Sequence, residues 1–359
     1  MSSPLPAPAD CRVVRLNNTL FPTSELERSL CDYFGIAVDP AETDDPDELI
    51  DTLAGCDALA VVSTSLPTEV VRSLARCRLI SRLGNGTDKI DVATATEMGI
   101  VVSNAPFFCA EEMTDHIVAM LLALARQLPR MQDHMRAGRF RQARAEATRL
   151  QRLSTSTLGL VGFGATGEMV ARRAQAFGMC VIATRRNLQV LPPPAAALGV
   201  EMVDMETLLA RSDYVSLQLP LNAESYHLFD EAMLRRMKPG SFLINTSRGA
   251  LVDEEALARV LREGPLAGAA LDTYEWLDVF TLEEQPLDHP LMELDNVLVT
   301  SHVSAHSVQS GEDVARTSVQ NLASVLNGRW PAPENIVNAG VVPRQPLQTH
   351  DPALVTLPC

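Results

Sequence analysis

The sequence predicts an α/β protein of two domains, each built around a parallel sheet. Short apolar runs rich in valine, leucine and isoleucine alternate with amphipathic stretches along most of the chain. This alternation occurs in two series, and a long helical stretch without strands separates them. At 359 residues, 46% of them hydrophobic, the chain is long enough to fill two cores.

The first series begins at residue 11. Its expected strands are residues 11–16, 57–63, 78–84 and 99–104. Its expected helices are residues 23–35, 45–55 and 68–77. Strands that alternate with helices favour parallel pairing with right-handed crossovers.

The stretch from 110 to 138 is expected to form one long helix, with apolar residues every three or four positions. Its apolar stripe consists of Met113, Ile117, Met120, Leu121, Leu124 and Leu128. No predicted strand lies beside it in the sequence. We therefore expect this helix to bridge domains or subunits and to bury its stripe in a homodimer.

The second series begins at Thr157 and has the same alternating pattern. Its expected strands are residues 157–164, 179–185, 214–220, 241–247, 266–273 and 296–302. A further helix is expected at 311–328. No internal repeat is visible, although both series have the same style.

Composition and charge exclude several classes of protein. A net charge of −15 argues against direct nucleic-acid binding, and no apolar run is long enough to span a membrane. The N-terminus lacks the basic and apolar stretches of a secretory signal. Seven cysteines without close pairing indicate a reducing compartment, no disulfide framework and no metal site. We expect a cytoplasmic protein with disordered tails at 1–10 and 343–359.

The string GFGATG at 162–167 fits the G-x-G-x-x-G pattern of dinucleotide sites. It follows an apolar strand and precedes a helix, which is the context that the pattern requires. The glycines permit a tight turn and close approach to a pyrophosphate, and the helix N-terminus supplies N–H donors. The expected cofactor residues here are Gly162, Gly164, Ala165, Thr166 and Gly167.

The end of the next strand bears on the choice of cofactor. Sites selective for NAD place an acid there to bind the ribose 2′-hydroxyl. This chain instead has Thr184, Arg185 and Arg186. Two arginines attract a 2′-phosphate, so we expect a preference for NADP(H), with NAD(H) possible.

Two strand ends deliver candidate catalytic residues. The string MKPGSFLINTSRGALVD, at 237–253, places Arg248 after a buried strand, where its guanidinium can grip a carboxylate with two hydrogen bonds. The string DNVLVTSHVSAHS, at 295–307, places His302 at the end of the last strand. Imidazole suits proton exchange with a hydroxyl or carbonyl oxygen near neutral pH. His306 is a weaker candidate for the substrate pocket.

These strings together resemble the D-isomer-specific 2-hydroxyacid dehydrogenases, a family that includes D-3-phosphoglycerate, D-lactate, formate and phosphite dehydrogenases and the C-terminal-binding corepressors. The resemblance covers most of the chain, from Arg12 to Gly340. It implies two Rossmann-like domains with parallel sheets and an interdomain cleft. The substrate domain would comprise residues 11–107 plus 309–342, because the last helix rejoins it, and the dinucleotide domain would comprise residues 108–308.

The resemblance also implies roles for individual residues. Arg248 and the amides of Gly84, Asn85 and Gly86 would hold the carboxylate of a 2-oxoacid, and His302 would exchange the proton of its carbonyl oxygen. The dinucleotide would also meet Leu219, Pro220, Thr246 and Asp272. Thr64 lies in the second substrate loop, which lacks the arginines of phosphoglycerate-specific relatives. The implied reaction is hydride transfer between NAD(P)H and a small 2-oxoacid or D-2-hydroxyacid.

This chain departs from the family pattern at two points. Ser301 stands where the family usually has proline. Without gaps, Leu277 occupies the position of the glutamate that binds the catalytic histidine, and Gln285 does so if an insertion comes earlier. The carboxylates that could replace this glutamate are Glu275, Asp278 and Glu284, and the sequence does not choose among them.

The lost glutamate keeps two alternative functions open. One is a dinucleotide-sensing, corepressor-like binding protein with little turnover. The tail NGRWPAPENIVN, which resembles that of the C-terminal-binding proteins, supports it. The other is a dehydrogenase of a non-carboxylate anion such as phosphite.

Overall fold

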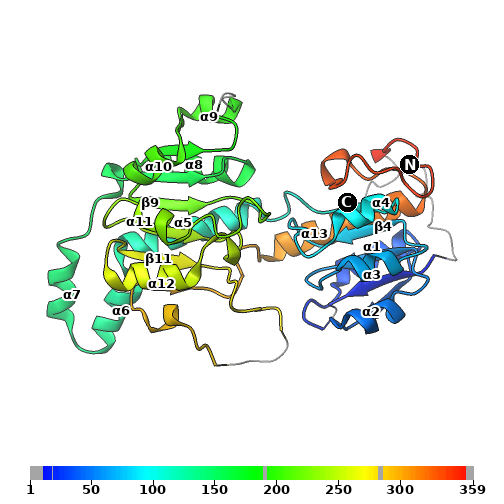
Figure 1. Cartoon of the computed structure of the whole chain (residues 1–359), viewed down its shortest axis with the longest axis horizontal. Coiled ribbons are helices and arrows are strands. Elements are labelled where there is room, and N and C mark those ends of the chain that lie inside the picture. Colours follow the sequence, from blue (N-terminus) through cyan, green and yellow to red (C-terminus); the bar gives the residue numbers. More distant parts are fainter. Residues whose placement is uncertain (1–10, 18, 189–191, 282–285, 353–359) are drawn as a thin grey trace. The chain divides into compact units, whose positions relative to one another are not determined.

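The computed structural model of the protein describes residues 11–17, 19–188, 192–281 and 286–352. Contacts divide the chain into two units, residues 1–108 with 307–359 and residues 109–306. The boundaries expected at 107/108 and 308/309 fall beside these divisions. Figure 1 shows both units as α/β structures.

The sheet of the first unit has five parallel strands in the order β2-β1-β3-β4-β5. The strands are β1 Val13–Leu16, β2 Val38–Ala41, β3 Ala58–Val61, β4 Leu79–Arg82 and β5 Val101–Ser103. The helices are α1 Glu25–Tyr33, α2 Pro46–Thr52, α3 Thr68–Ser73, α4 Val92–Glu97 and α13 Val308–Leu326. Separate apolar clusters fill the two faces of this sheet, so it is doubly wound.

Two elements of the first unit are absent from the sequence prediction. Strand β2 contains Asp39 and Pro40, which are depleted in strands, and it pairs on one side only. Helix α4 is short and begins where Asp91 caps the Thr94 amide. Strand β2 depends on its pairing with β1, and helix α4 depends on a single cap. Neither has a strong periodic pattern of apolar residues in the sequence.

The C-terminal segment expected as a tail is partly described. Residues 343–352 contact the first unit: Arg344 Nε donates to the Met98 carbonyl at 3.0 Å, and Gln348 donates to the Gly328 carbonyl at 2.8 Å. The expectation of a disordered tail is therefore wrong for residues 343–352, because backbone and side-chain hydrogen bonds fix them. Residues 1–10 and 353–359 lie outside the described part.

The sheet of the second unit has seven parallel strands in the order β12-β11-β10-β9-β6-β7-β8. The strands are β6 Thr157–Val161, β7 Cys180–Thr184, β8 Glu201–Met202, β9 Tyr214–Leu217, β10 Phe242–Asn245, β11 Gly268–Leu271 and β12 Val297–Val299. The two-residue edge strand β8 was not predicted. The strand order reverses between β6 and β9, where doubly wound sheets bind ligands outside the carboxyl ends.

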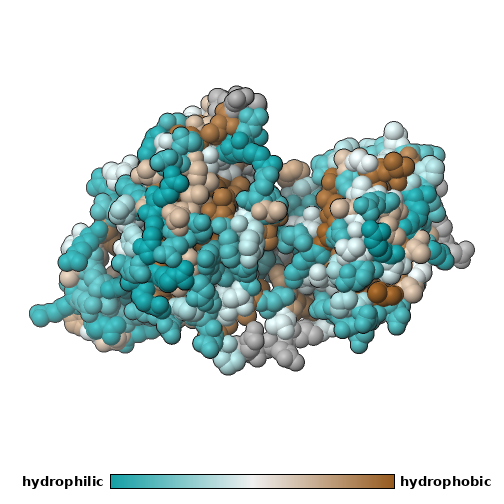
Figure 2. Space-filling view, in the orientation of Figure 1, coloured by the Kyte–Doolittle hydropathy of each residue, from teal (hydrophilic) through white to brown (hydrophobic). Residues whose placement is uncertain are grey.

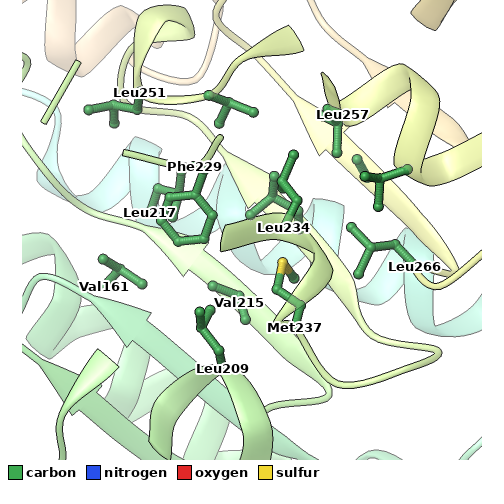
Figure 3. Close-up of a cluster of buried hydrophobic side chains, with 14 of the residues drawn as sticks. Val161, Leu209, Val215, Leu217, Phe229, Leu234, Met237, Leu251, Leu257 and Leu266 are labelled. Atoms are coloured by element: carbon green, nitrogen blue, oxygen red, sulfur yellow. The ribbon is translucent and has the colours of Figure 1, made fainter. Parts of the chain in front are cut away.

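Helices cover both faces of this sheet. They are α5 Ala110–Arg126, α8 Ala165–Ala176, α9 Pro193–Leu198, α10 Met205–Arg211, α11 Glu231–Arg235 and α12 Glu254–Glu263. Figure 3 shows one core, to which α11 contributes Leu234, α12 contributes Leu257 and β9 contributes Val215. The short 3-10 turns are η1 Leu153–Thr155, η2 Gly249–Leu251, η3 Pro290–Glu293 and, in the first unit, η4 Pro333–Asn335. Most of the surface in view is hydrophilic (Figure 2).

The long helix expected at 110–138 is broken, and the prediction of one continuous helix is wrong. Helix α5 ends before Gln127, whose φ is 46°, and α6 then runs over Leu128–Arg136, followed by α7 at Phe140–Ala147. Pro129 explains the break, because proline has no N–H to donate and its ring clashes with the preceding turn.

The expectation that this helix has no sheet beneath it is also wrong. Ile117, Met120, Leu121 and Leu124 of α5 are buried in one core with residues of β6, β10 and β11. Its apolar stripe is therefore satisfied within the second unit, by a sheet whose strands come later in the sequence. Leu128, at the end of the stripe, is 55% exposed. Within the described ranges, no helix is both long and apolar enough to cross a membrane.

Candidate active site

The turn between β6 and α8 is shaped by its glycines. Gly162 has a φ of 103°, and a Cβ atom there would lie 2.4 Å from the Gln218 carbonyl oxygen. Its N–H donates to the Thr184 carbonyl at 2.9 Å, which joins the turn to the end of β7. A Cβ on Gly167 would lie 3.0 Å from the Gly162 carbonyl oxygen. Only glycine fits the first position, and the second allows close packing of helix on strand.

Gly164 leaves open space at the start of α8. It is the N-cap in an extended conformation, no described side chain caps it, and a Cβ there would meet nothing within 4 Å. The first intrahelical bond runs from the Glu168 amide to the Gly164 carbonyl. The amides of Ala165, Thr166 and Gly167 precede this bond, so they are the donors that a pyrophosphate would use. The turn fits a dinucleotide.

The residues after β7 have a partner that the sequence did not reveal. Thr184 is buried, whereas Arg185 and Arg186 are exposed. Arg186 forms an ion pair with Glu224, and both side chains are more than 70% exposed. The Asn222 side chain accepts from the Glu224 amide at 2.9 Å and holds this turn. An acid therefore does stand beside the arginines, but it arrives from another loop.

That loop follows β9 and begins with the expected cofactor residues Leu219 and Pro220. Leu219 is half-buried and Pro220 is exposed. The Ser225 hydroxyl donates to the Pro220 carbonyl at 2.8 Å, which closes the loop into a compact turn. No local motif marks Glu224, because it is separated from Arg186 by 38 positions in the sequence.

Arg248 follows β10 in a turn that the neighbouring side chains fix. The Asn245 side chain donates to the Arg248 carbonyl at 2.8 Å and accepts from the Ser247 amide at 3.1 Å. The Ser247 hydroxyl donates to the Leu217 carbonyl of β9 at 2.7 Å. Thr246 is 2% exposed, and its hydroxyl has no hydrogen-bond partner among the described residues. A buried, unsatisfied hydroxyl at this edge fits a ligand contact.

The residue after Arg248 packs against a second loop. A Cβ on Gly249 would lie 2.0 Å from the Tyr274 carbonyl carbon and 2.2 Å from the Glu275 amide nitrogen. The 274–276 backbone therefore touches the Arg248 turn. The Glu254 carboxyl group, which is 5% exposed, accepts from the Glu275 amide at 3.2 Å and the Trp276 amide at 3.3 Å. Burial raises the pKa of Glu254 to about 7.

Glu275, one of the carboxylates considered as the partner of His302, binds a different histidine. Its Oε2 lies 2.5 Å from His227 Nε2. His227 has a φ of 46°, and the Tyr226 ring stacks on it at a centroid distance of 4.1 Å. Neither Glu254 nor His227 was singled out from the sequence, since neither belongs to a pattern that indicates its contacts.

His302 lies just after β12, in a turn with unusual backbone geometry. Its φ is 55°, a left-handed conformation that few non-glycine residues adopt. The side chain is half-buried, and the Phe280 ring lies at a centroid distance of 4.8 Å. Ser301, where the family usually has proline, is exposed and leaves the histidine at the strand end. His306 is exposed.

Asp272, expected to meet the dinucleotide, is fully buried beneath this turn. Its carboxylate accepts from the Thr300 hydroxyl at 2.5 Å and from the amides of Val303 and Ser304 at 3.0 Å each. Asp272 thus binds residues on both sides of His302 in the sequence. A contact with the cofactor stays a prediction, whereas the contact with the histidine turn is direct.

The residues considered for the position of the family glutamate follow β11 in the chain. Leu277 is half-buried, and the Asp278 carboxylate accepts from the Phe280 amide at 2.9 Å. Glu284 and Gln285 lie outside the described part of the chain. The predicted alternatives Glu275 and Asp278 therefore have the contacts given above, and the third is not placed.

The first unit holds the two expected substrate loops. Gly84 has a φ of 146°, and a Cβ there would lie 2.4 Å from an Arg82 guanidinium nitrogen. Its carbonyl accepts from the Ala105 amide, and the Asn85 carbonyl accepts from the Asn104 side chain at 2.7 Å. These bonds fix the backbone that leads into half-buried Gly86.

The second loop follows β3. The Asn17 side chain accepts from the amides of Ser63 and Thr64 at 2.9 and 3.0 Å. The Thr64 hydroxyl is buried and has no hydrogen-bond partner among the described residues, which fits a residue that meets a ligand.

The structure brings together most of the expected residues of the second unit. Thr246 and Arg248 follow β10, Asp272 follows β11 and His302 follows β12, and these three strands are neighbours. The glycine turn follows β6 at the same edge. Gly84, Asn85, Gly86 and Thr64 belong to the other unit.

Comparison with known protein families finds a match over most of the second unit. The profile "D-isomer specific 2-hydroxyacid dehydrogenase, NAD binding domain" matches residues 118–304. A glyoxylate reductase from Thermococcus litoralis is 35% identical over 303 residues, which cover 83% of this chain and 88% of that protein.

Solved structures give the same result. The D-lactate dehydrogenase from Aquifex aeolicus, complexed with NAD and lactic acid, has a TM-score of 0.80 and 27% identity, covering 90% of this chain and 98% of its own. An acyclic imino acid reductase in complex with NADPH and D-Arg has a TM-score of 0.77 and 27% identity, covering 91% and 99%. The chain belongs to the family of D-isomer-specific 2-hydroxyacid dehydrogenases.

Proposed function

We propose that this protein reduces a small 2-oxoacid to the D-2-hydroxyacid with NADPH, and catalyses the reverse reaction. One observation carries the proposal. Arg248 follows β10 and His302 follows β12, in the sheet whose β6–α8 turn fits a pyrophosphate, and buried Asp272 follows β11, the strand between them. An anion grip, a proton donor and a dinucleotide turn at one sheet edge are the parts that this reaction needs.

The residues of the chain bind and orient the substrate. The Arg248 guanidinium holds the carboxylate with two hydrogen bonds. Once bound, the nicotinamide supplies the hydride for C2. His302 gives its proton to the carbonyl oxygen, and in the reverse reaction it takes the proton back. Asp272 orients the nicotinamide carboxamide while it holds the His302 turn.

The proposed preference for NADPH rests on Arg185 and Arg186. Both are exposed after β7, where a 2′-phosphate would meet them. Glu224 pairs with Arg186, so it competes with the phosphate for that guanidinium. Arg185 is therefore the arginine on which we place most of the preference.

Glyoxylate is the first substrate to test. The relative from Thermococcus litoralis is named a glyoxylate reductase, and the second substrate loop of this chain, Val61 to Thr64, has no arginine for a phosphate group. Imino acids are the second group of substrates to test, because one similar structure is an acyclic imino acid reductase. They are supplied by mixing a 2-oxoacid with an amine.

One observation favours a second candidate, a dinucleotide-binding protein with little turnover. Leu277 occupies the ungapped position of the family glutamate, and the nearby Glu275 carboxylate is engaged with His227. A leucine side chain carries no charge with which to stabilise a protonated histidine, as the family glutamate does. This candidate retains the dinucleotide turn and loses only catalytic rate.

We further propose a cytoplasmic homodimer, on different grounds from the stripe of α5. Three large apolar side chains on α6 and α7 are exposed: Leu128 at 55%, Met135 at 62% and Phe140 at 57%. A second copy would cover them. Light scattering at micromolar concentration should give twice the mass of the chain, and a monomeric mass would reject this assembly.

The decisive experiment is a panel of 2-oxoacids, with glyoxylate first, assayed with NADPH and NADH. Phosphite and imino acids complete the panel. Calorimetry with each dinucleotide runs in parallel. NADPH-dependent reduction of a 2-oxoacid supports the dehydrogenase. Tight dinucleotide binding without turnover of any member would favour the binding protein instead.

A further inference from the structure

His116 lies beneath the turn that carries His302, although no motif marked it. It belongs to α5, and its side chain is 21% exposed. Its Nε2 lies 3.0 Å from the Thr300 hydroxyl and 3.7 Å from the Asp272 carboxylate. All of these residues belong to the second unit, so the contacts lie within one compact body.

The hydrogen bonds fix which group donates. The Thr300 hydroxyl has one hydrogen, and its bond of 2.5 Å to the Asp272 carboxylate uses it. The same oxygen must then accept from His116, so His116 carries its proton on Nε2. The result is a chain in which His116 donates to Thr300 and Thr300 donates to Asp272.

This chain of hydrogen bonds supports a strained backbone turn. His302, two residues after Thr300, has a φ of 55°, and such geometry persists in a non-glycine residue only where the surroundings hold it. Asp272 holds the side after His302, through the amides of Val303 and Ser304. On the side before it, Thr300 is held through its hydroxyl by the His116–Asp272 chain.

We propose that His116 is a positioning residue for His302, acting through Thr300 and Asp272 and touching neither substrate nor cofactor. The proposal rests on the proposed function, in which His302 is the proton donor. Without the His116 N–H, the Thr300 hydroxyl keeps only its bond to Asp272, and the turn loses one of the contacts that hold it. His302 then spends less time in the geometry for proton transfer.

The effect should be partial, because Thr300 has a second anchor. The Tyr274 hydroxyl lies 2.8 Å from the Thr300 carbonyl and 3.1 Å from the Leu271 carbonyl. This contact holds the backbone of Thr300, whereas its hydroxyl is held by His116 and Asp272. Small displacements of catalytic groups cost up to about a hundredfold in rate, so we expect a loss of about tenfold to a hundredfold.

The test compares two replacements of the histidine. His116→Leu removes the donor, whereas His116→Gln keeps an N–H that can reach Thr300. The leucine variant should lower kcat by about tenfold or more, with the KM for the oxoacid and the Kd for NADPH within about twofold of wild type. The glutamine variant should recover most of kcat. Glu111→Gln, at an exposed position of the same helix, is the matched control and should change nothing.

A second pair of variants keeps the test decisive if the leucine variant does not fold. Thr300→Val removes the hydroxyl and Thr300→Ser keeps it, so only the valine variant should lose kcat. Where both single variants fold, combining His116→Leu with Thr300→Val should lower kcat no further than either alone, because both break the same chain.

The outcomes separate this inference from the proposed function. If His302→Asn abolishes turnover but neither His116→Leu nor Thr300→Val changes kcat, the positioning role of His116 is wrong and the catalytic assignment stands. A rise in KM with unchanged kcat would also reject the positioning role. If His302→Asn itself retains full turnover, the proposed function fails first.

Discussion

The two halves of the second unit's carboxyl edge are built by different means. In the dinucleotide half, β6, α8 and β7 present backbone amides, and glycines at 162 and 167 allow the close approach. In the half that carries His302, side chains do the positioning. Asp272 reaches Thr300 across 28 positions of sequence, and His116 reaches it across 184.

This difference explains why the dinucleotide half could be recognised from the sequence, whereas the side-chain contacts of the half that carries His302 could not. A backbone site needs particular residues within a few consecutive positions, so it leaves a motif. A side-chain network needs only that distant residues meet, and the sequence pattern of each is ordinary. The dinucleotide half should therefore tolerate side-chain changes, and the catalytic half should not.

The largest test of this contrast is His302→Asn. Asparagine adopts the left-handed conformation at 302 more readily than most residues, so the turn should survive while the acid–base group is lost. General acid–base catalysis contributes about 10² to 10⁴ in rate, and kcat should fall by this factor. Calorimetry should show NADPH affinity within about twofold of wild type, because the dinucleotide half is separate.

Two results would contradict the assignment. A variant that keeps the wild-type rate would make another group the proton donor. A variant that loses NADPH binding along with turnover would show that the two halves are not independent.

The second test concerns the support of the Arg248 turn by Glu254. The pKa of Glu254 is about 7 in the folded protein, whereas it has the ordinary value of a glutamate, 4.5, in the unfolded chain. The folded state therefore holds the proton more tightly. The associated stability is fully present below about pH 4.5 and is lost as pH rises through 7, by about 3 kcal/mol at most.

Glu254→Gln should remove this loss, since a neutral amide oxygen can still accept from the Glu275 and Trp276 amides. The free energy of unfolding, measured in urea from pH 5 to pH 8, should fall less steeply in the variant than in wild type. Glu111→Gln, at an exposed site, should follow the wild-type curve. Parallel curves for wild type and Glu254→Gln would show that Glu254 is not buried in the way described.

The sequence predicted elements wherever the signal was local. The central strands of both sheets have apolar runs that indicate them, whereas the edge strands β2 and β8 do not. One long helix was predicted across Gln127, because the apolar spacing continues past Pro129. The face that covers α5 was missed, because its sheet comes from strands later in the chain.

The site shows the same limit. The positions of Arg248 and His302 at strand ends followed from short apolar runs and a family string. The pairing of Glu275 with His227, and of Arg186 with Glu224, depends on loops that fold back from elsewhere. No pattern within either loop indicates its partner, so these contacts became visible only in three dimensions.

The third test addresses how Arg248 binds its ligand. Arg248→Lys keeps the charge and loses the planar fork, so only one hydrogen bond to a carboxylate remains. The KM for the oxoacid should rise and kcat/KM should fall by about tenfold or more. Steady-state kinetics with the best substrate of the panel gives both constants. Unchanged kinetics would remove Arg248 from the site.

The smallest expected effect lies in the dinucleotide half, where exposed side chains choose between cofactors. Wild type should bind NADPH about tenfold more tightly than NADH, the equivalent of about 1.4 kcal/mol, and Arg185→Asp should reverse that order.

Glu224→Gln releases Arg186 and removes a charge that repels the 2′-phosphate. It should tighten NADPH binding by a few-fold and leave NADH binding unchanged, since NADH has no phosphate there. Calorimetry at low and high salt measures both, and the NADPH advantage should shrink as salt screens the exposed charges. Tighter binding of NADH by wild type would overturn the cofactor preference. An effect of Glu224→Gln on NADH as large as on NADPH would mean that the loop after β9 shapes the pocket instead of tuning its charge.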